Sequence, residues 1–111
     1  MEISVLRTGG IAGVRERLGP IDTSALADDL GDRLEAKVEE MGFFDFPERI
    51  PDESTIYDAF QHDITVSDGD RRHSVTFSDG AEERYRRPLG ELVQLLRETG
   101  SDFEDEPREA G

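Results

Sequence analysis

The chain has 111 residues, and its 27 Asp and Glu against 13 Lys and Arg give a formal net charge of −14 at pH 7. This length suits one domain with one modest core, and the absence of cysteine excludes disulfides, thiolate catalysis and cysteine-bound metals. Such an acidic surface repels phosphate backbones, which argues against nucleic acid as a partner.

Lys37 is the single lysine, and acidic residues are spread along the whole chain. An acidic, lysine-poor surface is typical of proteins that work in concentrated salt, where a Debye length of about 3 Å near 1 M screens self-repulsion. The alternative is an acidic protein from an ordinary cytoplasm. No apolar run approaches the roughly 18 residues that span a bilayer, and Met1–Ile3 enters a strand pattern without a leader-like segment. We therefore expect a cytoplasmic protein without membrane contact.

The first element predicted is a hairpin. Ile3 and Val5 share one face of a strand over 2–8, and residues 14–18 continue as its partner. The connecting loop, Thr8–Gly13, holds one large apolar residue, Ile11, among glycines. Glycines permit positive φ and a close approach of the backbone to another surface. The loop is therefore predicted to contact a partner.

An amphipathic helix of about four turns is predicted next. The cluster 22–24 offers caps and Gly42 ends the helix. The apolar residues recur every three or four positions: Leu26, Leu30, Leu34, Val38 and Met41. The aromatic run 43–46 then has two interpretations: a core plug under the helix end, which we favour, or a binding patch. Residues 48–54 are predicted to be irregular.

A second hairpin is predicted over 60–77, with a turn at Asp68-Gly69. Its alternation puts His62 and His73 on the apolar face beside Phe60 and Phe77. No carboxylate shares that face in the pattern and a third ligand is lacking, so we interpret them as hydrogen-bonded core or rim histidines and not as a metal site.

The last predicted element is a helix with Pro88 in its first turn, the stripe Leu89, Leu92, Val93 and Leu96, and an end at Gly100. Residues 101–111 are mostly acidic and are predicted to be a disordered tail. In the alternative, Phe103 packs back onto the domain. In the first interpretation, residues 1–100 form one α+β domain and residues 101–111 trail from it.

The order ββαββα predicts a two-layer α+β fold. In it, a four-stranded antiparallel sheet made of two hairpins carries both helices on its apolar face. The strand order is left open. The expected core joins Ile3, Val5, Ile64, Val66, Val75 and Phe77 to Leu30, Leu34, Val38, Leu92 and Leu96.

Catalytic motifs are missing from the sequence. It contains no GxxxxGK phosphate loop, no HExxH and no Ser/His/Asp set with a plausible elbow. Gly9-Gly10 with Gly13 is too short for a dinucleotide fingerprint. We expect a protein that is not an enzyme and needs no cofactor or metal.

Several segments, in this order, resemble the emfourin family: RTGGIAG, IDT, GFFDFP, ITVSDGDRRHSVTFSDG and RRPLGELVQLLR. The resemblance covers about residues 3–97, and its most specific parts are the loop Arg7–Gly13 and the pair Phe43-Phe44. Emfourins are small intracellular protein inhibitors of thermolysin-like zinc metalloproteases. The resemblance implies such a protease as partner, and we expect the chain itself to be a monomer.

The partner-binding residues that the resemblance implies are Arg7, Thr8, Gly9, Gly10, Ile11, Ala12 and Gly13. Thermolysin-like enzymes prefer a bulky apolar residue just after the scissile bond, so Ile11 is the candidate anchor in the active-site cleft. In the alternative, Ile11 folds back over its own domain. Arg7 and Arg15 are either rim contacts to the enzyme or cross-strand salt-bridge partners. The rival function is a non-inhibitory binding or adaptor module of a halophilic cytoplasm.

Overall fold

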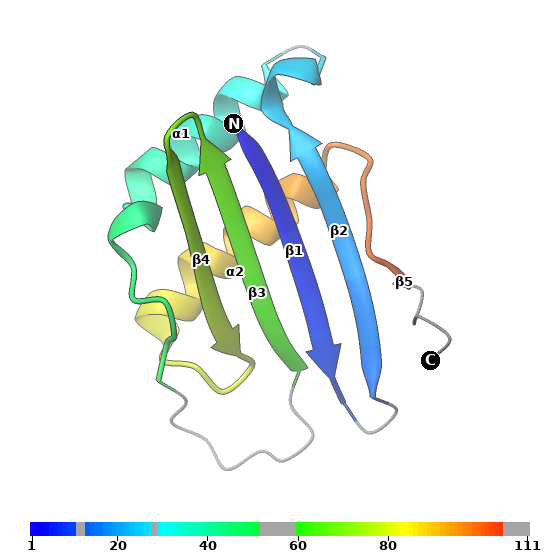
Figure 1. Cartoon of the computed structure of the whole chain (residues 1–111), viewed down its shortest axis with the longest axis vertical. Helices are drawn as coiled ribbons and strands as arrows, with labels where there is room; N and C mark the ends of the chain where they lie inside the picture. Colours follow the sequence, from blue (N-terminus) through cyan, green and yellow to red (C-terminus); the bar gives the residue numbers. More distant parts are fainter. Residues whose placement is uncertain (11–12, 28, 52–59, 106–111) are drawn as a thin grey trace.

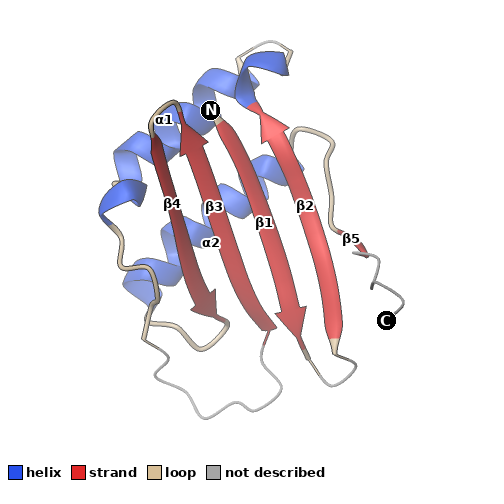
Figure 2. Cartoon of the chain, in the orientation of Figure 1, coloured by secondary structure: helices blue, strands red, loops and turns tan. Residues whose placement is uncertain are grey.

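The computed structural model describes residues 1–10, 13–27, 29–51 and 60–105. These residues form two layers, a twisted antiparallel sheet and two helices on one of its faces (Figures 1 and 2). The sheet order is β4-β3-β1-β2-β5. The α+β class, the ββαββα order and the antiparallel sheet are confirmed, with a short fifth strand added at one edge.

The first hairpin pairs β1 (Glu2–Gly9) with β2 (Val14–Asp22). Strand β2 runs beyond its predicted end at Leu18, because a bulge at Gly19 and Pro20 shifts the register between Ile3 and Val5 and lets pairing continue to Asp22. The second hairpin pairs β3 (Phe60–Asp68) with β4 (Arg71–Ser78). Strand β3 lies beside β1, so the two N-terminal strands of the hairpins form the centre of the sheet.

Helix α1 (Leu30–Met41) is shorter than predicted. Residues Thr23–Ala25 form a separate 3-10 turn, η1, capped by Asp22, and the chain is extended at Leu26. Leu30 is therefore the first helical residue and is only partly buried, which corrects its place in the predicted core. Gly42 ends the helix in the left-handed conformation, as predicted.

The aromatic run forms a second 3-10 turn, η2 (Phe43–Asp45), under the end of α1. Phe43 is fully buried, and Phe44 and Phe46 pack against the core. The interpretation as a core plug is confirmed. Ile50 is also buried, and residues 48–50 run along the edge of β4, where Ile50 N–H donates to the Thr76 carbonyl.

Helix α2 (Glu83–Arg97) crosses behind the sheet from the β4 edge to the β2 edge (Figure 1). It begins before Pro88, so the charged run that was expected to precede the helix forms its first turn. Proline in the second turn removes a single intrahelical bond, to the carbonyl of Arg84, and the amphipathic stripe outweighs that loss. Leu89, Leu92 and Leu96 are fully buried.

The core lies between the sheet and the helices. Except for Leu30, every predicted core residue is buried, and others join them: Leu18, Ile21, Phe43, Ile50, Ala81 and Leu89. None of the helices in the described part of the chain is both long and apolar enough to cross a membrane.

The segment after Gly100 lies along the β2 edge of the sheet as far as Asp105. Strand β5 (Glu104–Asp105) pairs with β2 at Glu16 and Arg17, and Phe103 packs against the core. The alternative in which Phe103 packs back is therefore the arrangement found, because pairing with the β2 edge fixes the backbone beside it. The division into a 1–100 domain and a 101–111 tail stays a prediction, and residues 106–111 lie outside the described residues.

Candidate functional site

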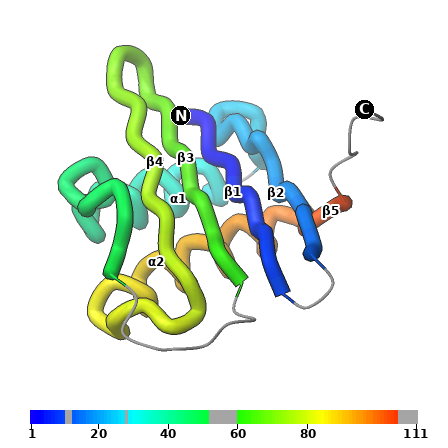
Figure 3. The backbone as a smooth tube through the Cα atoms, turned by 60° about the horizontal axis from the view of Figure 1, so that its bottom comes forward, coloured from blue at the N-terminus to red at the C-terminus, as the bar shows by residue number. Residues whose placement is uncertain are grey.

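The candidate site is the end of the sheet where β1 ends and β2 and β3 begin, which Figure 3 brings forward. Arg7, Thr8 and Gly9 are the last residues of β1. Gly9 pairs with Val14, so residues 10–13 form the turn, and Gly13 N–H donates to the Gly10 carbonyl at 3.2 Å. Ile11 and Ala12, including the candidate anchor side chain, lie outside the described residues.

The described glycines of this turn have left-handed backbone conformations. Their φ angles are +107° at Gly9, +75° at Gly10 and +62° at Gly13. L-residues with a side chain rarely adopt such angles. The glycine-rich sequence is therefore needed for the shape of the turn itself.

Phe60 supports the turn from the helix side of the sheet. It pairs with Gly9 across the β1–β3 ladder, and a Cβ atom at Gly10 would lie 3.1 Å from Phe60 Cε1. The Gly10 backbone thus approaches the ring more closely than a side chain would allow. The sequence predicted Phe60 to lie on the apolar face, but its contact with the turn depends on β3 lying next to β1, which one sequence does not reveal.

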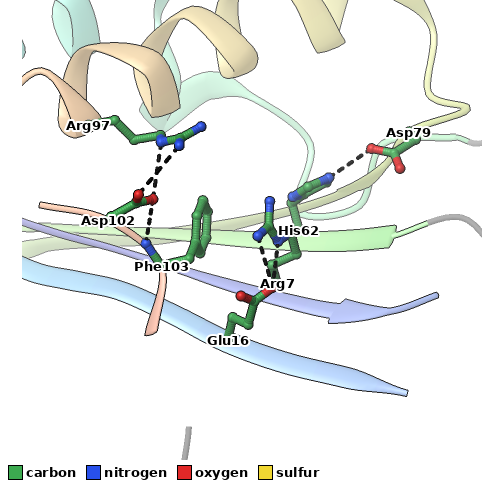
Figure 4. A network of polar contacts seen from close by, with 7 residues as sticks. All are labelled: Arg7, Glu16, His62, Asp79, Arg97, Asp102 and Phe103. Carbon is green, nitrogen blue, oxygen red and sulfur yellow. Dashed lines mark hydrogen bonds and ion pairs between the residues drawn. The ribbon is translucent and has the colours of Figure 1, made fainter. Parts of the chain in front are cut away.

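Arg7 links the first hairpin to the C-terminal segment (Figure 4). Its Nη2 and Nε donate to Glu16 Oε1 at 2.8 and 3.1 Å. Its guanidinium carbon lies 4.0 Å from the centre of the Phe103 ring and 5.4 Å from that of Phe60. The Arg7 and Glu16 side chains are only 28% and 21% exposed. Of the two alternatives for Arg7, the cross-strand salt bridge is the one found.

Arg15 pairs with Thr8 across the hairpin. Thr8 follows Arg7 in the same strand, and successive side chains of a strand point to opposite faces. Thr8 and Arg15 are thus assigned to the face of the sheet away from the helices, so the two arginines that flank the loop lie on opposite faces.

The C-terminal segment is fastened by Asp102. Its carboxylate accepts a hydrogen bond from Phe103 N–H at 2.8 Å and pairs with Arg97 Nε at 3.2 Å. The hydrogen bond from Phe103 lowers the pKa of the Asp102 carboxyl, and Arg97 adds to the effect. Both contacts favour the charged form of Asp102, which is the form that pairs with Arg97.

The histidines are packed and hydrogen-bonded, as predicted. His62 stacks on Phe77 with ring centres 4.8 Å apart, and its Nε2 lies 2.9 Å from Asp79 Oδ1. His73 Nε2 donates to the Phe46 carbonyl at 2.7 Å. Asp79 was missed because it comes from the turn after β4 and not from the alternating face. Among the residues that the structure describes, no three His, Asp or Glu side chains are grouped to hold a metal ion.

A hollow of about 530 Å³ lies along the β4 edge. Its lining includes His73, whose Nε2 is occupied by the Phe46 carbonyl. At the turn, by contrast, the Gly10 backbone lies against Phe60, and Arg7 with its partners holds the preceding end of β1.

Comparison with known proteins supports one assignment. The family model described as Emfourin matches residues 5–97. The match runs from β1 to the last residue of α2 and includes the whole loop at 8–13. No curated protein and no solved structure matches the chain.

Proposed function

Because this chain belongs to the Emfourin family, we propose that it is a protein inhibitor of thermolysin-like zinc metalloproteases, with the β1–β2 loop entering the active-site cleft. Family membership suggests a metalloprotease inhibitor role and a metalloprotease partner. The choice of enzyme class and of the loop is our proposal. It is supported above all by the backbone shape of the turn, which glycines at 9, 10 and 13 maintain.

The charge distribution favours the loop as the contact surface. Charged residues make up 36% of the chain, yet residues 8–14 carry no charge. Desolvating such a segment in an enzyme cleft costs less than desolvating a charged one, since no ionised group loses its water. Of the two flanking arginines, Arg7 is paired with Glu16 within the sheet, and Arg15 is proposed as a contact at the rim of the enzyme cleft.

Preorganisation favours the same loop. Gly10 packs on Phe60, and Arg7 is held by Glu16 and Phe103. A loop whose ends are fixed before binding loses less conformational entropy on association. In this proposal Arg7, Thr8, Gly9, Gly10 and Gly13 shape the loop and its rim, Ala12 adds backbone contact, and Ile11 is the anchor for the enzyme pocket that receives the residue after the scissile bond.

The test is inhibition by Ile11→Ala. Interface energy concentrates in a few anchors, so loss of this side chain should weaken inhibition by about 1 to 3 kcal/mol, roughly fivefold to more than a hundredfold. The melting temperature should barely change. Inhibition is measured in molar KCl against the cognate protease and against thermolysin, and the melting temperature is measured in the same buffer.

Leu95→Ala is the matched control, because Leu95 is a partly buried apolar residue of α2. It should lower the melting temperature and leave inhibition by the folded protein unchanged. Full inhibition by Ile11→Ala would refute the anchor role. Absence of inhibition of every thermolysin-like enzyme by the wild-type protein would favour the adaptor alternative.

A further inference from the structure

The C-terminal segment 101–105 lies outside the part of the chain that matches the family, yet it contacts the arginine that precedes the loop. We propose that Phe103 is a positioning residue for the loop: by stacking on Arg7 it holds the end of β1, and with it the β1–β2 turn, in the conformation that binds the protease. This inference rests on the proposed function.

Phe103 has a fixed position at the edge of the sheet. On one side of Phe103, Asp102 pairs with Arg97 on α2, and on the other side the next two residues pair with β2. The ring therefore sits on a segment held at both ends, and it packs against the core. Figure 4 shows it beside Arg7, between α2 and the sheet.

Arg7 links Phe103 to the turn. The Arg7 guanidinium lies 4.0 Å from the Phe103 ring centre and also contacts Glu16, which pairs with Asp105 of β5. Its second ring contact is Phe60, against which Gly10 packs. A continuous series of contacts thus runs from Phe103 through Arg7 and Phe60 to the backbone of the turn.

A turn rich in glycine needs such support to keep one conformation. Glycines at 9, 10 and 13 give the turn its shape, but glycine also has the greatest backbone freedom in solution. When the competent conformation is only partly populated, apparent affinity falls by that fraction. Contacts that restrict the ends of the turn therefore raise affinity without touching the enzyme.

The experiment replaces Phe103 by leucine and by tyrosine in the full chain. Leucine keeps apolar bulk but removes the ring face that attracts a cation. Phe103→Leu should raise the inhibition constant about two- to fivefold, the range expected for loss of one exposed cation–π contact. In the free protein it should lower the NMR order parameters of the Gly9, Gly10 and Gly13 amides. Phe103→Tyr keeps a ring and should restore both.

Phe44→Leu is the matched control. The Arg71 guanidinium lies 4.2 Å from the Phe44 ring centre, a contact of the same kind at the opposite end of the sheet. Phe44→Leu should change neither the order parameters of the glycine amides nor the inhibition constant of the folded protein. Asp102→Ala, which removes both the pair with Arg97 and the acceptor for Phe103 N–H, should loosen the turn in the same direction as Phe103→Leu. It serves if Phe103→Leu does not fold.

Wild-type order parameters at the three glycines in both Phe103→Leu and Asp102→Ala would overturn the positioning role. Weaker inhibition by Phe103→Leu with unchanged order parameters would also overturn it, since Phe103 would then act by touching the enzyme. If the wild-type protein inhibits no thermolysin-like enzyme but the glycine amides still respond, the positioning of the turn is supported and the proposed function is what fails.

Discussion

At Gly31 only a hydrogen atom fits on the Cα, because a Cβ built there would lie 2.2 Å from the Thr23 carbonyl oxygen. Thr23 cannot move aside easily. It is buried, its N–H donates to the Met1 carbonyl, and its hydroxyl donates to Glu35 on α1. The close approach of the helix start to the η1 turn therefore depends on this one glycine.

Replacing Gly31 with alanine should lower the free energy of unfolding by about 1 to 3 kcal/mol, the usual cost of forcing an atom into a packed site. Gly90 in α2 is the matched control, since a Cβ there meets nothing within 4 Å. Gly90→Ala should stabilise by roughly 0.5 to 1 kcal/mol through helix propensity. Urea unfolding in molar KCl measures both changes. If the free energy of unfolding changed in the same direction in the two variants, the clash at Gly31 would not be the cause.

The hydrophobic period of α1 correctly predicted which side chains face the sheet from Leu34 onward. The prediction failed at Leu30. The same period extends back to Leu26, but Leu26 is extended and follows the η1 turn, so the helix begins only at Leu30. The cluster 22–24 was expected to cap the N-terminus of this helix, but Asp22 caps η1 instead. Periodicity reports which residues are apolar, and not where backbone hydrogen bonds switch from one element to another.

Leu34 and Leu30 test this account of the helix. Leu34 is fully buried, so Leu34→Ala should leave a cavity and cost roughly 2 to 5 kcal/mol of stability. Leu30 is only partly buried at the first helical position, so Leu30→Ala should cost no more than about 1 kcal/mol. Denaturant melts of the two variants give the comparison. A larger loss at Leu30 than at Leu34 would mean that the helix packs with a different face.

For the molecule as a whole, the class, the element order and most of the core could be predicted from alternation and helical period. The strand order could not be predicted, because no local sequence pattern indicates that β1 lies between β2 and β3. The same limit applied to the prediction of the candidate site. The glycine turn was visible as a motif, whereas its support by Phe60 and Phe103 joins residues far apart in sequence. Such contacts follow from topology and not from any local pattern.

The excess of acid acts on the whole molecule at once. With principal extents of 39 × 35 × 25 Å, the protein is about as large as the Debye length of roughly 30 Å at 0.01 M salt, so each carboxylate repels nearly all the others. Near 1 M that length is about 3 Å and only neighbouring charges interact. Salt also weakens attractive pairs such as Arg71 with Glu39 and Lys37 with Glu91, but exposed pairs contribute only about 0 to 1 kcal/mol each.

With a net charge of −14, relief of repulsion should outweigh the loss of these pairs, and the melting temperature should rise as KCl goes from millimolar to molar. For a domain of this size, each 1 kcal/mol of relieved repulsion raises it by roughly 4 °C or more. Most of the rise should come below about 0.3 M, where screening changes fastest. Sucrose at matched osmolality is the control: it favours burial without screening, so the steep early rise should be missing. A melting temperature that stays flat or falls in KCl would show that self-repulsion does not limit this fold.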